Sequence, residues 1–257
     1  MTAPPTFTHP LLDAVPGVRH AFFSREGGAS QGIYAGLNVG RGSRDDPAAV
    51  AENRRRAAAV FGRTEADLLT CHQIHSAIAH VATAPFGAAR PEGDAVVSRA
   101  SGLICGALSA DCAPILLADG TAGVVGAAHA GWKGALTGVA EATVAAMERE
   151  GADRARITAV VGPCIGPASY EVGLDFLQRF VDEAPGSEAQ FAPGATADKR
   201  MFDLPAFVLA RLAACGVTQA AWIGIDTCAD ARFFSNRRAF HRGEPDYGRL
   251  LSAIMLV

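Results

Sequence analysis

The chain has 257 residues, of which 49% are hydrophobic, 23 are basic and 26 are acidic, giving a formal net charge of −3. This composition excludes general disorder, and the scattered basic residues give no face for nucleic acid. The N-terminal segment lacks the basic and apolar regions of a signal peptide, and no apolar run reaches the roughly 20 residues of a membrane helix. Six cysteines without C-x-x-C spacing indicate thiols rather than disulfides. We therefore expect a cytoplasmic protein with neither a nucleic-acid nor a membrane partner.

After a loose proline-rich start, the first half of the chain predicts a strand at Val18 to Ser24 and a long polar loop over 25–46. Asp46 and Pro47 begin a helix that ends at Gly62, with its arginines on the solvent face. A short helix follows near Glu65 to Leu69. Further apolar segments are expected as strands: AIAHVAT (77–83), GDAVVS (93–98), LICGALS (103–109), PILLAD (114–119) and GVVGAA (123–128).

The second half predicts three helices, over Gly134 to Glu150, Leu174 to Val181 and, capped by Asp203, up to Gly216. Strands are expected at 157–162, 220–226 and 250–257, and polar loops at 185–199 and 233–248. About eight strands and three or four helices, not in strict alternation, predict an α+β (mixed α/β) fold of packed mixed β-sheets flanked by helices. No linker divides the chain, so we expect a single domain over 1–257.

Two residues with metal-binding or nucleophilic chemistry lie at the outer ends of two adjacent predicted strands. Cys112 precedes 114–119 and His129 follows 123–128, and a tight turn at Asp119-Gly120 would bring these outer ends together. A thiolate beside an imidazole can bind zinc or act as a nucleophile with its base. The simpler alternative is that Cys112 is a small buried apolar residue. Asp111 can orient a ligand or transfer a proton, or it can be an ordinary turn carboxylate.

A third ligand is available from His75, which enters a predicted strand from a polar loop. Two histidines and one cysteine leave a fourth position open, as in catalytic zinc sites, where bound water has a pKa of about 7. His72 and His80 are rival positions, and a histidine at a strand end is often only hydrogen-bonded.

The turn Ala130 to Gly134 precedes a helix and combines glycines with Lys133. Exposed N–H groups at a helix start bind anions, so Gly131 and Lys133 are candidates for contact with a phosphate group. An ordinary strand-to-helix turn, with Trp132 in the core, is the alternative.

Together these segments resemble the laccase-domain family of purine nucleoside phosphorylases, also described as YfiH-like or multicopper polyphenol oxidase-like. The resemblance covers nearly the whole chain, and its most specific part is ADC-x-P (110–114) followed by HAGWKG (129–134). Other matching segments are FFSREGGASQGIYAGLNVG (22–40), DDPAAVAENR (45–54), HQIHS (72–76), GDAVVS (93–98), GPCIG with YEV (162–172), FFSNRR (233–238) and YGRLLSAI (247–254). Lys133 departs from the family, where arginine is more usual, and lysine cannot bind phosphate bidentately.

The resemblance implies that His75, Cys112 and His129 are zinc ligands, with copper as the other metal reported for the family. It implies phosphorolysis of adenosine, inosine and methylthioadenosine, with adenosine deamination at the same site. Asp111 is our candidate for proton transfer, although the H-x-E and P-C-x-x-C signatures of nucleobase deaminases are absent. Asn38, Arg54 and Arg249 lie in family-like motifs and are candidate substrate contacts, with structural roles as the alternative.

The sequence is also compatible with three other functions. A copper-dependent polyphenol oxidase would need a histidine-rich cluster beyond one His2Cys set, and the chain has only seven histidines. A cysteine hydrolase would use Cys112 as nucleophile and His129 as base. A role in editing peptidoglycan precursors, which the resemblance also implies, would replace the nucleoside with a cell-wall precursor. The sequence predicts no oligomeric state.

Overall fold

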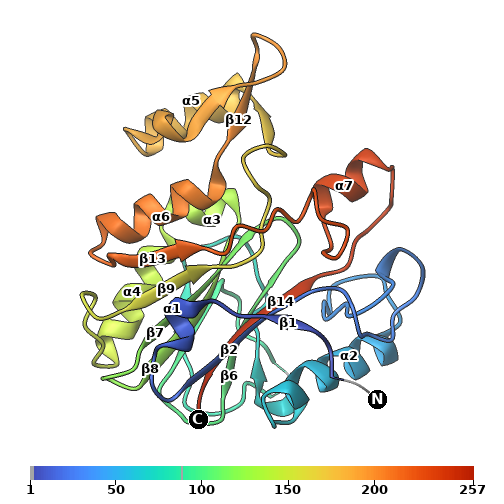
Figure 1. The fold of residues 1–257 in the computed structure, drawn as a ribbon, viewed down its shortest axis with the longest axis vertical. Helices are drawn as coiled ribbons and strands as arrows, with labels where there is room; N and C mark the ends of the chain where they lie inside the picture. The colour runs from blue at the N-terminus through green and yellow to red at the C-terminus, as the bar shows by residue number, and fades with distance from the viewer. Residues whose placement is uncertain (1–2, 88) are drawn as a thin grey trace.

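The computed structural model describes residues 3–87 and 89–257, and it contains two large β-sheets stacked between helices (Figure 1). The start of the chain, expected to be loose, forms a short strand and a helical turn within its described residues; residues 1–2 lie outside them. The mixed α/β class predicted from the sequence is confirmed. Across the described residues, no helix has both the length and the apolar character needed to cross a bilayer.

The first large sheet has five strands in the order β1-β2-β14-β6-β3. These strands are β1 (Thr6–Phe7), β2 (Val18–Phe23), β3 (Leu68–Leu69), β6 (Ile104–Ser109) and β14 (Leu250–Leu256). All neighbours are antiparallel except β3, which pairs in parallel with β6. The last strand of the chain therefore lies in the middle of this sheet, between β2 and β6.

The second large sheet has six strands in the order β13-β9-β7-β8-β5-β4. These strands are β4 (Ala79–Val81), β5 (Ala95–Ser98), β7 (Ala113–Asp119), β8 (Val124–Ala130), β9 (Thr158–Val161) and β13 (Gln219–Trp222). Strands β7 and β8 form an antiparallel hairpin at its centre. Each edge strand is parallel to its neighbour: β13 to β9, and β4 to β5. Both large sheets are thus mixed.

Alternate residues of β7 pack against different layers, as the two-residue period of a strand requires. Leu116 and Ala118 face the first sheet and pack with a cluster that includes Phe22. Ile115 and Leu117 face the helices on the other side. Because β7 is buried on both faces, its sequence is a continuous apolar run rather than an alternating one.

Helices cover the outer face of each sheet (Figure 1). Helices α3 (Trp132–Thr137), α4 (Val139–Arg149) and α6 (Leu204–Ala214) pack on the six-stranded sheet. Helix α2 (Pro47–Val60) packs Ala57 and Ala58 on the five-stranded sheet. The remaining helices are α1 (Pro10–Asp13), α5 (Leu174–Glu183) and α7 (Asn236–His241), with 3₁₀ turns at Gly32–Tyr34, Glu65–Asp67 and Ser187–Gln190.

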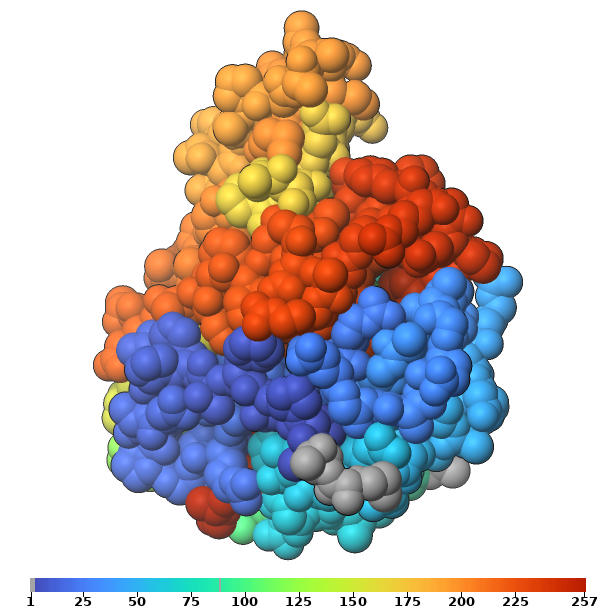
Figure 2. All heavy atoms as spheres, turned by 45° about the vertical axis from the view of Figure 1, so that its right-hand side comes forward, coloured from blue at the N-terminus to red at the C-terminus, as the bar shows by residue number. Residues whose placement is uncertain are grey.

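A small antiparallel sheet projects from the main body together with α5 (Figure 2). Its strands are β10 (Glu171–Gly173), β11 (Phe191–Pro193) and β12 (Lys199–Phe202). Aromatic rings hold this projection together: Phe176 and Phe180 of α5 stack at 4.8 Å, and Phe191 stacks on Phe202 at 4.6 Å.

Several sequence-based expectations are corrected. The helix expected over 134–150 is two helices, because Gly138 has a left-handed φ of 101° and ends α3. The loop expected at 185–199 contains β11 and the start of β12, which aromatic packing stabilises. The loop expected at 233–248 contains α7, and the short helix expected near Glu65 is a 3₁₀ turn followed by β3. Arg54 of α2 is only 1% exposed rather than on the solvent face.

Candidate metal centre and active-site cavity

The β7–β8 hairpin brings Cys112 and His129 together. Ala113 pairs with Ala130 and Pro114 with His129, so Cys112, one residue before β7, lies at the same end of the hairpin as His129. The predicted proximity is therefore present in the fold, although the turn is longer than the tight Asp119-Gly120 turn expected: residues 120–123 join Asp119 to its partner Val124.

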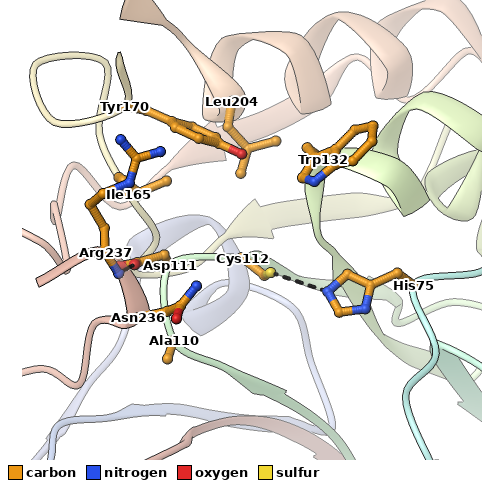
Figure 3. Close-up of a pocket in the computed structure, with 10 residues that line it drawn as sticks. All are labelled: His75, Ala110, Asp111, Cys112, Trp132, Ile165, Tyr170, Leu204, Asn236 and Arg237. Carbon is orange, nitrogen blue, oxygen red and sulfur yellow. Dashed lines mark hydrogen bonds between the residues drawn. The ribbon is translucent and has the colours of Figure 1, made fainter. Parts of the chain in front are cut away.

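His75 completes a cluster of three potential ligands. Its Nε2 lies 3.8 Å from Sγ of Cys112 (Figure 3), and its ring centroid lies 4.9 Å from that of His129. One ligand atom from each of the three residues lies within 4.8 Å of the other two. His75 has a left-handed φ of 60°, which is uncommon for a non-glycine residue and is often associated with a functional site. These side chains could together hold one metal ion.

Asp94 holds His75 and His129 in position through hydrogen bonds. Its Oδ1 lies 2.9 Å from Nδ1 of His129 and accepts the backbone N–H of His75 at 3.1 Å. Its Oδ2 accepts both the backbone N–H and the hydroxyl of Ser76. A carboxylate on one ring nitrogen directs the other nitrogen toward a metal and raises its basicity. Burial opposes the charge on Asp94, but hydrogen bonds from His129 and Ser76 outweigh burial and lower its pKa to about 2.

Electrostatics favours a thiolate beside imidazoles. Burial disfavours ionised Cys112, yet the adjacent rings of His129 and His75 lower the pKa of this thiol below its ordinary value. Burial likewise disfavours charged His129, but Cys112 and Asp94 raise the pKa of this imidazole. The thiolate is the form that binds a metal or attacks an electrophile.

The cluster opens into a cavity of about 200 Å³. Figure 3 shows Cys112 and His75 on one side of this cavity, with Tyr170 and Leu204 across from Cys112. The complete lining is His75, Ala110, Asp111, Cys112, Trp132, Ile165, Tyr170, Leu204, Asn236 and Arg237. Tyr170 just before β10, Leu204 at the start of α6 and two residues of α7 therefore supply walls that stand over the end of the hairpin. Apolar walls with a few converging polar groups are typical of small-molecule sites.

Asp111 lines this cavity, but its carboxylate is fully engaged by neighbours. Oδ1 accepts the hydroxyl of Thr227 at 2.7 Å, and Oδ2 accepts the hydroxyl of Ser235 and the backbone N–H of Arg237. Asp111 has a left-handed φ of 82° and is 7% exposed. Burial raises the pKa of Asp111, against these hydrogen bonds. In this structure Asp111 joins the start of β7 to α7; its predicted role in proton transfer stays a prediction.

The other predicted contact residues divide between this cavity and more distant positions. Gly131 adjoins the cluster, since a Cβ at this position would lie 2.5 Å from Cδ2 of His75 and 3.0 Å from Sγ of Cys112. Lys133 is exposed on α3 and is not part of the cavity lining. Asn38, Arg54 and Arg249 also lie outside that lining. The side chain of Asn38 accepts the backbone N–H of Arg249, which fits the structural alternative for this pair.

Sequence reasoning missed several residues that matter here. Asp94 stood at the start of a predicted strand, where a Gly-Asp pair looks like a turn. Tyr170, Asn236 and Arg237 lay in segments that the family resemblance included, but no local pattern pointed them toward Cys112. Trp132, which the alternative reading of its turn places in the core, packs against the core while also lining the cavity, and its ring centroid lies 5.2 Å from that of Phe176.

Comparison with known proteins agrees with the motif resemblance. A purine nucleoside phosphorylase of Deinococcus radiodurans is 42% identical over 241 residues, covering 93% of this chain and 90% of the relative. The purine nucleoside phosphorylase ORF3 of Streptomyces griseus is 41% identical over 227 residues, covering 87% and 91%.

Solved structures show the same fold. A Neisseria meningitidis protein, 32% identical, superposes with a TM-score of 0.87 and covers 99% of both chains. The hypothetical protein YfiH of Bacillus licheniformis, 27% identical, superposes with a TM-score of 0.88 over 99% of this chain and 97% of that one. The profile of the family described as multi-copper polyphenol oxidoreductase laccase matches residues 19–257. The chain therefore belongs to this laccase-like family.

Proposed function

We propose that this protein is a zinc-dependent purine nucleoside phosphorylase that cleaves adenosine, inosine and methylthioadenosine with phosphate. The observation that carries the proposal is the convergence of His75, Cys112 and His129 at the mouth of a cavity that other polar and aromatic side chains enclose. The names of the relatives from Deinococcus radiodurans and Streptomyces griseus support the same reaction class.

The donor set fits zinc. Zinc binds sulfur at about 2.3 Å and imidazole nitrogen at about 2.0–2.1 Å, so two ligands on one tetrahedral ion stand roughly 3.5 Å apart. The Sγ···Nε2 separation of 3.8 Å between Cys112 and His75 needs only a small contraction. Asp94 supplies the carboxylate partner that zinc-binding histidines usually have. Because Gly131 has no side chain, a space remains beside the cluster that a Cβ atom would fill.

Three protein ligands leave room for an oxygen-bearing group, and zinc supplies Lewis-acid polarisation there when bound. The residues of the chain then position the substrates around this point. Trp132 and Tyr170 offer aromatic surface to a purine ring. Arg237 offers positive charge to phosphate, and its guanidinium is held by the carbonyl oxygen of Glu171 at 2.9 Å and lies 5.1 Å from the Tyr170 ring centroid. This assigns the phosphate contact to Arg237 in preference to the exposed Lys133.

Phosphorolysis breaks the bond between the purine nitrogen and the ribose carbon while a phosphate oxygen bonds to that carbon, and the purine leaves with a proton. The cavity would hold phosphate and nucleoside side by side, which reduces the entropic barrier of a two-substrate reaction. Adenosine deamination in the same cavity stays a prediction of the family resemblance, with ammonia release as its assay.

Copper-dependent phenol oxidation is the competing activity suggested by the family description. Within residues 3–87 and 89–257, His75, Cys112 and His129 form the only cluster of three or more potential ligands. A multicopper oxidase needs a second, histidine-rich copper cluster, so the single cluster favours nucleoside chemistry.

The deciding experiment removes metal with a chelator and restores zinc or copper separately. We expect zinc, bound at one ion per chain, to restore phosphate-dependent release of purine from adenosine, inosine and methylthioadenosine. The variant Cys112→Ala should lose both zinc and this activity. Phenol oxidation with copper and no nucleoside cleavage with zinc would overturn the proposal. Activity that survives chelation but is lost on thiol alkylation would instead indicate a cysteine hydrolase. If no nucleoside is cleaved in either metal form, a peptidoglycan precursor becomes the substrate to test.

A further inference from the structure

A second cavity, of about 300 Å³, lies between the middle of α2, the 3₁₀ turn before β3 and the segment around Phe86. None of its lining residues belongs to the cavity at the metal cluster. The lining is Arg41, Arg54, Glu65, Ala66, Leu68, Leu69, Thr70, Pro85, Phe86, Gly87 and Arg90. Its distinguishing feature is the presence of three arginines from three separate segments of the chain.

The charges of this cavity do not balance. Of the described residues that line this cavity, Glu65 is the only acidic one, and its Oε1 accepts hydrogen bonds from both Arg41 and Arg54. Three guanidinium groups against one carboxylate leave two positive charges in excess. Arg90 is half-buried and has neither an ion pair nor a hydrogen bond among the described residues.

Arg54 is the guanidinium for which the excess of positive charge has the largest energetic cost, because it is buried. Its side chain is 1% exposed, and besides Glu65 it reaches only the carbonyl oxygens of Val39 and Leu68 and the hydroxyl of Thr70 at 3.3–3.4 Å. Burial, with Arg41 adding to it, lowers the pKa of Arg54 to about 10 despite the opposing effect of Glu65. Only Arg54 is held out of water, since the side chain of Arg41 is 41% exposed and Arg90 is half-buried. Arg54 shares its single counter-charge, Glu65, with Arg41, so an anion at the open side of the cavity would add the counter-charge that these arginines lack.

We infer that this cavity binds the phosphoryl group of a small phosphomonoester, between the guanidinium groups of Arg41 and Arg90 above the buried Arg54. A phosphate monoester carries about −1.5 to −2 charges near pH 7, which matches the excess of two, whereas a carboxylate carries one. Guanidinium groups donate paired N–H bonds to phosphate oxygens. The cavity also has room for a small body such as a sugar, which Phe86 and Leu69 would contact.

The test measures binding of ribose 5-phosphate, inorganic phosphate and uncharged ribose to the full-length protein by isothermal titration calorimetry. We expect saturable binding of ribose 5-phosphate and no binding of ribose. Arg90→Gln and Arg41→Gln should each weaken ribose 5-phosphate binding at least tenfold. Arg99→Gln is the matched control, because it removes one exposed arginine elsewhere and should leave the affinity unchanged. Among the described residues Arg90 has no hydrogen-bond partner to lose, so its variant keeps the test valid even if Arg41→Gln does not fold.

Phosphate is also a substrate of the proposed phosphorylase, so the experiment must distinguish binding at the second cavity from binding at the metal cluster. Arg237→Gln changes the cavity at the metal cluster and should leave ribose 5-phosphate binding at the second cavity intact. If Arg237→Gln abolishes binding while Arg90→Gln does not, the ligand sits at the metal cluster and the inference is wrong. Absence of saturable binding to the wild-type protein at millimolar concentrations would also overturn it. The readout requires no turnover, so it is independent of whether the protein cleaves nucleosides.

Discussion

The carboxylate of Asp94 lies 2.9 Å from Nδ1 of His129, and the backbone N–H of His129 returns a hydrogen bond to the carbonyl oxygen of Asp94 at 2.7 Å. This double link joins the start of β5 to the end of β8. The same carboxylate accepts the backbone N–H of His75, so one buried side chain sets the position of two proposed ligands from separate segments. The third proposed ligand, Cys112, is positioned independently by the hairpin.

The first prediction follows from this link. Asp94→Asn removes the negative charge next to His129 and should weaken zinc binding about 10- to 100-fold, which is the usual cost of losing such a partner. Competition with a chromophoric chelator measures this affinity. Asp119→Asn is the matched control, because Asp119 is an equally buried carboxylate remote from the cluster that also accepts backbone N–H groups. Wild-type zinc affinity in Asp94→Asn would contradict the positioning role.

The second prediction concerns the space beside the ligands. Gly131 has a φ of −65°, so alanine would fit its backbone, but the new Cβ would lie 2.5 Å from Cδ2 of His75. Gly131→Ala should therefore displace His75 and lower zinc affinity at least about tenfold, with an overpacking cost in the free energy of unfolding of roughly 1–3 kcal/mol. Gly42→Ala, where a Cβ meets nothing within 4 Å, should change neither quantity. Equal zinc affinities for the two variants would show that the site tolerates a methyl group.

Local sequence patterns were sufficient to predict the centre of the site. A glycine-containing turn between two apolar runs predicts an antiparallel hairpin, and a hairpin brings its outer ends together whatever surrounds it. The proximity of Cys112 and His129 could therefore be predicted. The mixed α/β class could also be predicted, because the apolar runs that form β7, β8 and β9 are too short for buried helices and are bounded by turn residues.

The walls of the cavity could not be predicted this way. Tyr170, Leu204 and Arg237 line the same cavity as Cys112 although they lie roughly 60 to 125 residues from it in the chain, a separation that leaves no periodic trace in the sequence. Strand β11 and the first residue of β12 lie in a segment of loop-like composition, and the ring of Phe180 in α5 packs on Phe191 of β11 and Phe202 of β12. Arg54 was misplaced for a similar reason: a buried arginine needs Glu65, and helix periodicity does not show that partner.

The third prediction tests the proposed phosphate contact. Arg237→Gln should raise the KM for phosphate at least about tenfold, because it removes a charge-assisted hydrogen bond, and change the KM for nucleoside less. Arg237→Lys keeps the charge without the planar guanidinium and should recover only part of the loss. Steady-state assays with each substrate varied in turn give both constants, and a thermal melt shows whether loss of the bond to Glu171 affects folding. The matched control is Lys133→Gln; a larger effect there would restore Lys133 as the phosphate contact.

The last prediction concerns stability against pH and depends on Asp119 at the β7–β8 turn. Its side chain is buried, and it accepts the backbone N–H groups of Thr121, Ala122 and Asp153 and a hydrogen bond from Arg156. Burial raises the pKa of Asp119, but these bonds outweigh burial and hold it below the ordinary value of 3.8. A pKa lowered by folding stabilises the protein above that ordinary value, and the stabilisation is lost as the pH falls below it.

Asp119→Asn should accordingly cost about 1–3 kcal/mol of unfolding free energy at pH 7, because a charged hydrogen-bond acceptor is lost. The difference between wild type and variant should shrink as the pH falls below about 4, since protonated Asp119 no longer gains from its donors. Urea denaturation at a series of pH values measures this difference. Asp182→Asn, which alters an exposed carboxylate bonded to Gln178 on α5, should show a small difference at every pH. If the cost of Asp119→Asn were the same at pH 3 as at pH 7, the carboxylate would stabilise the turn through its shape rather than its charge.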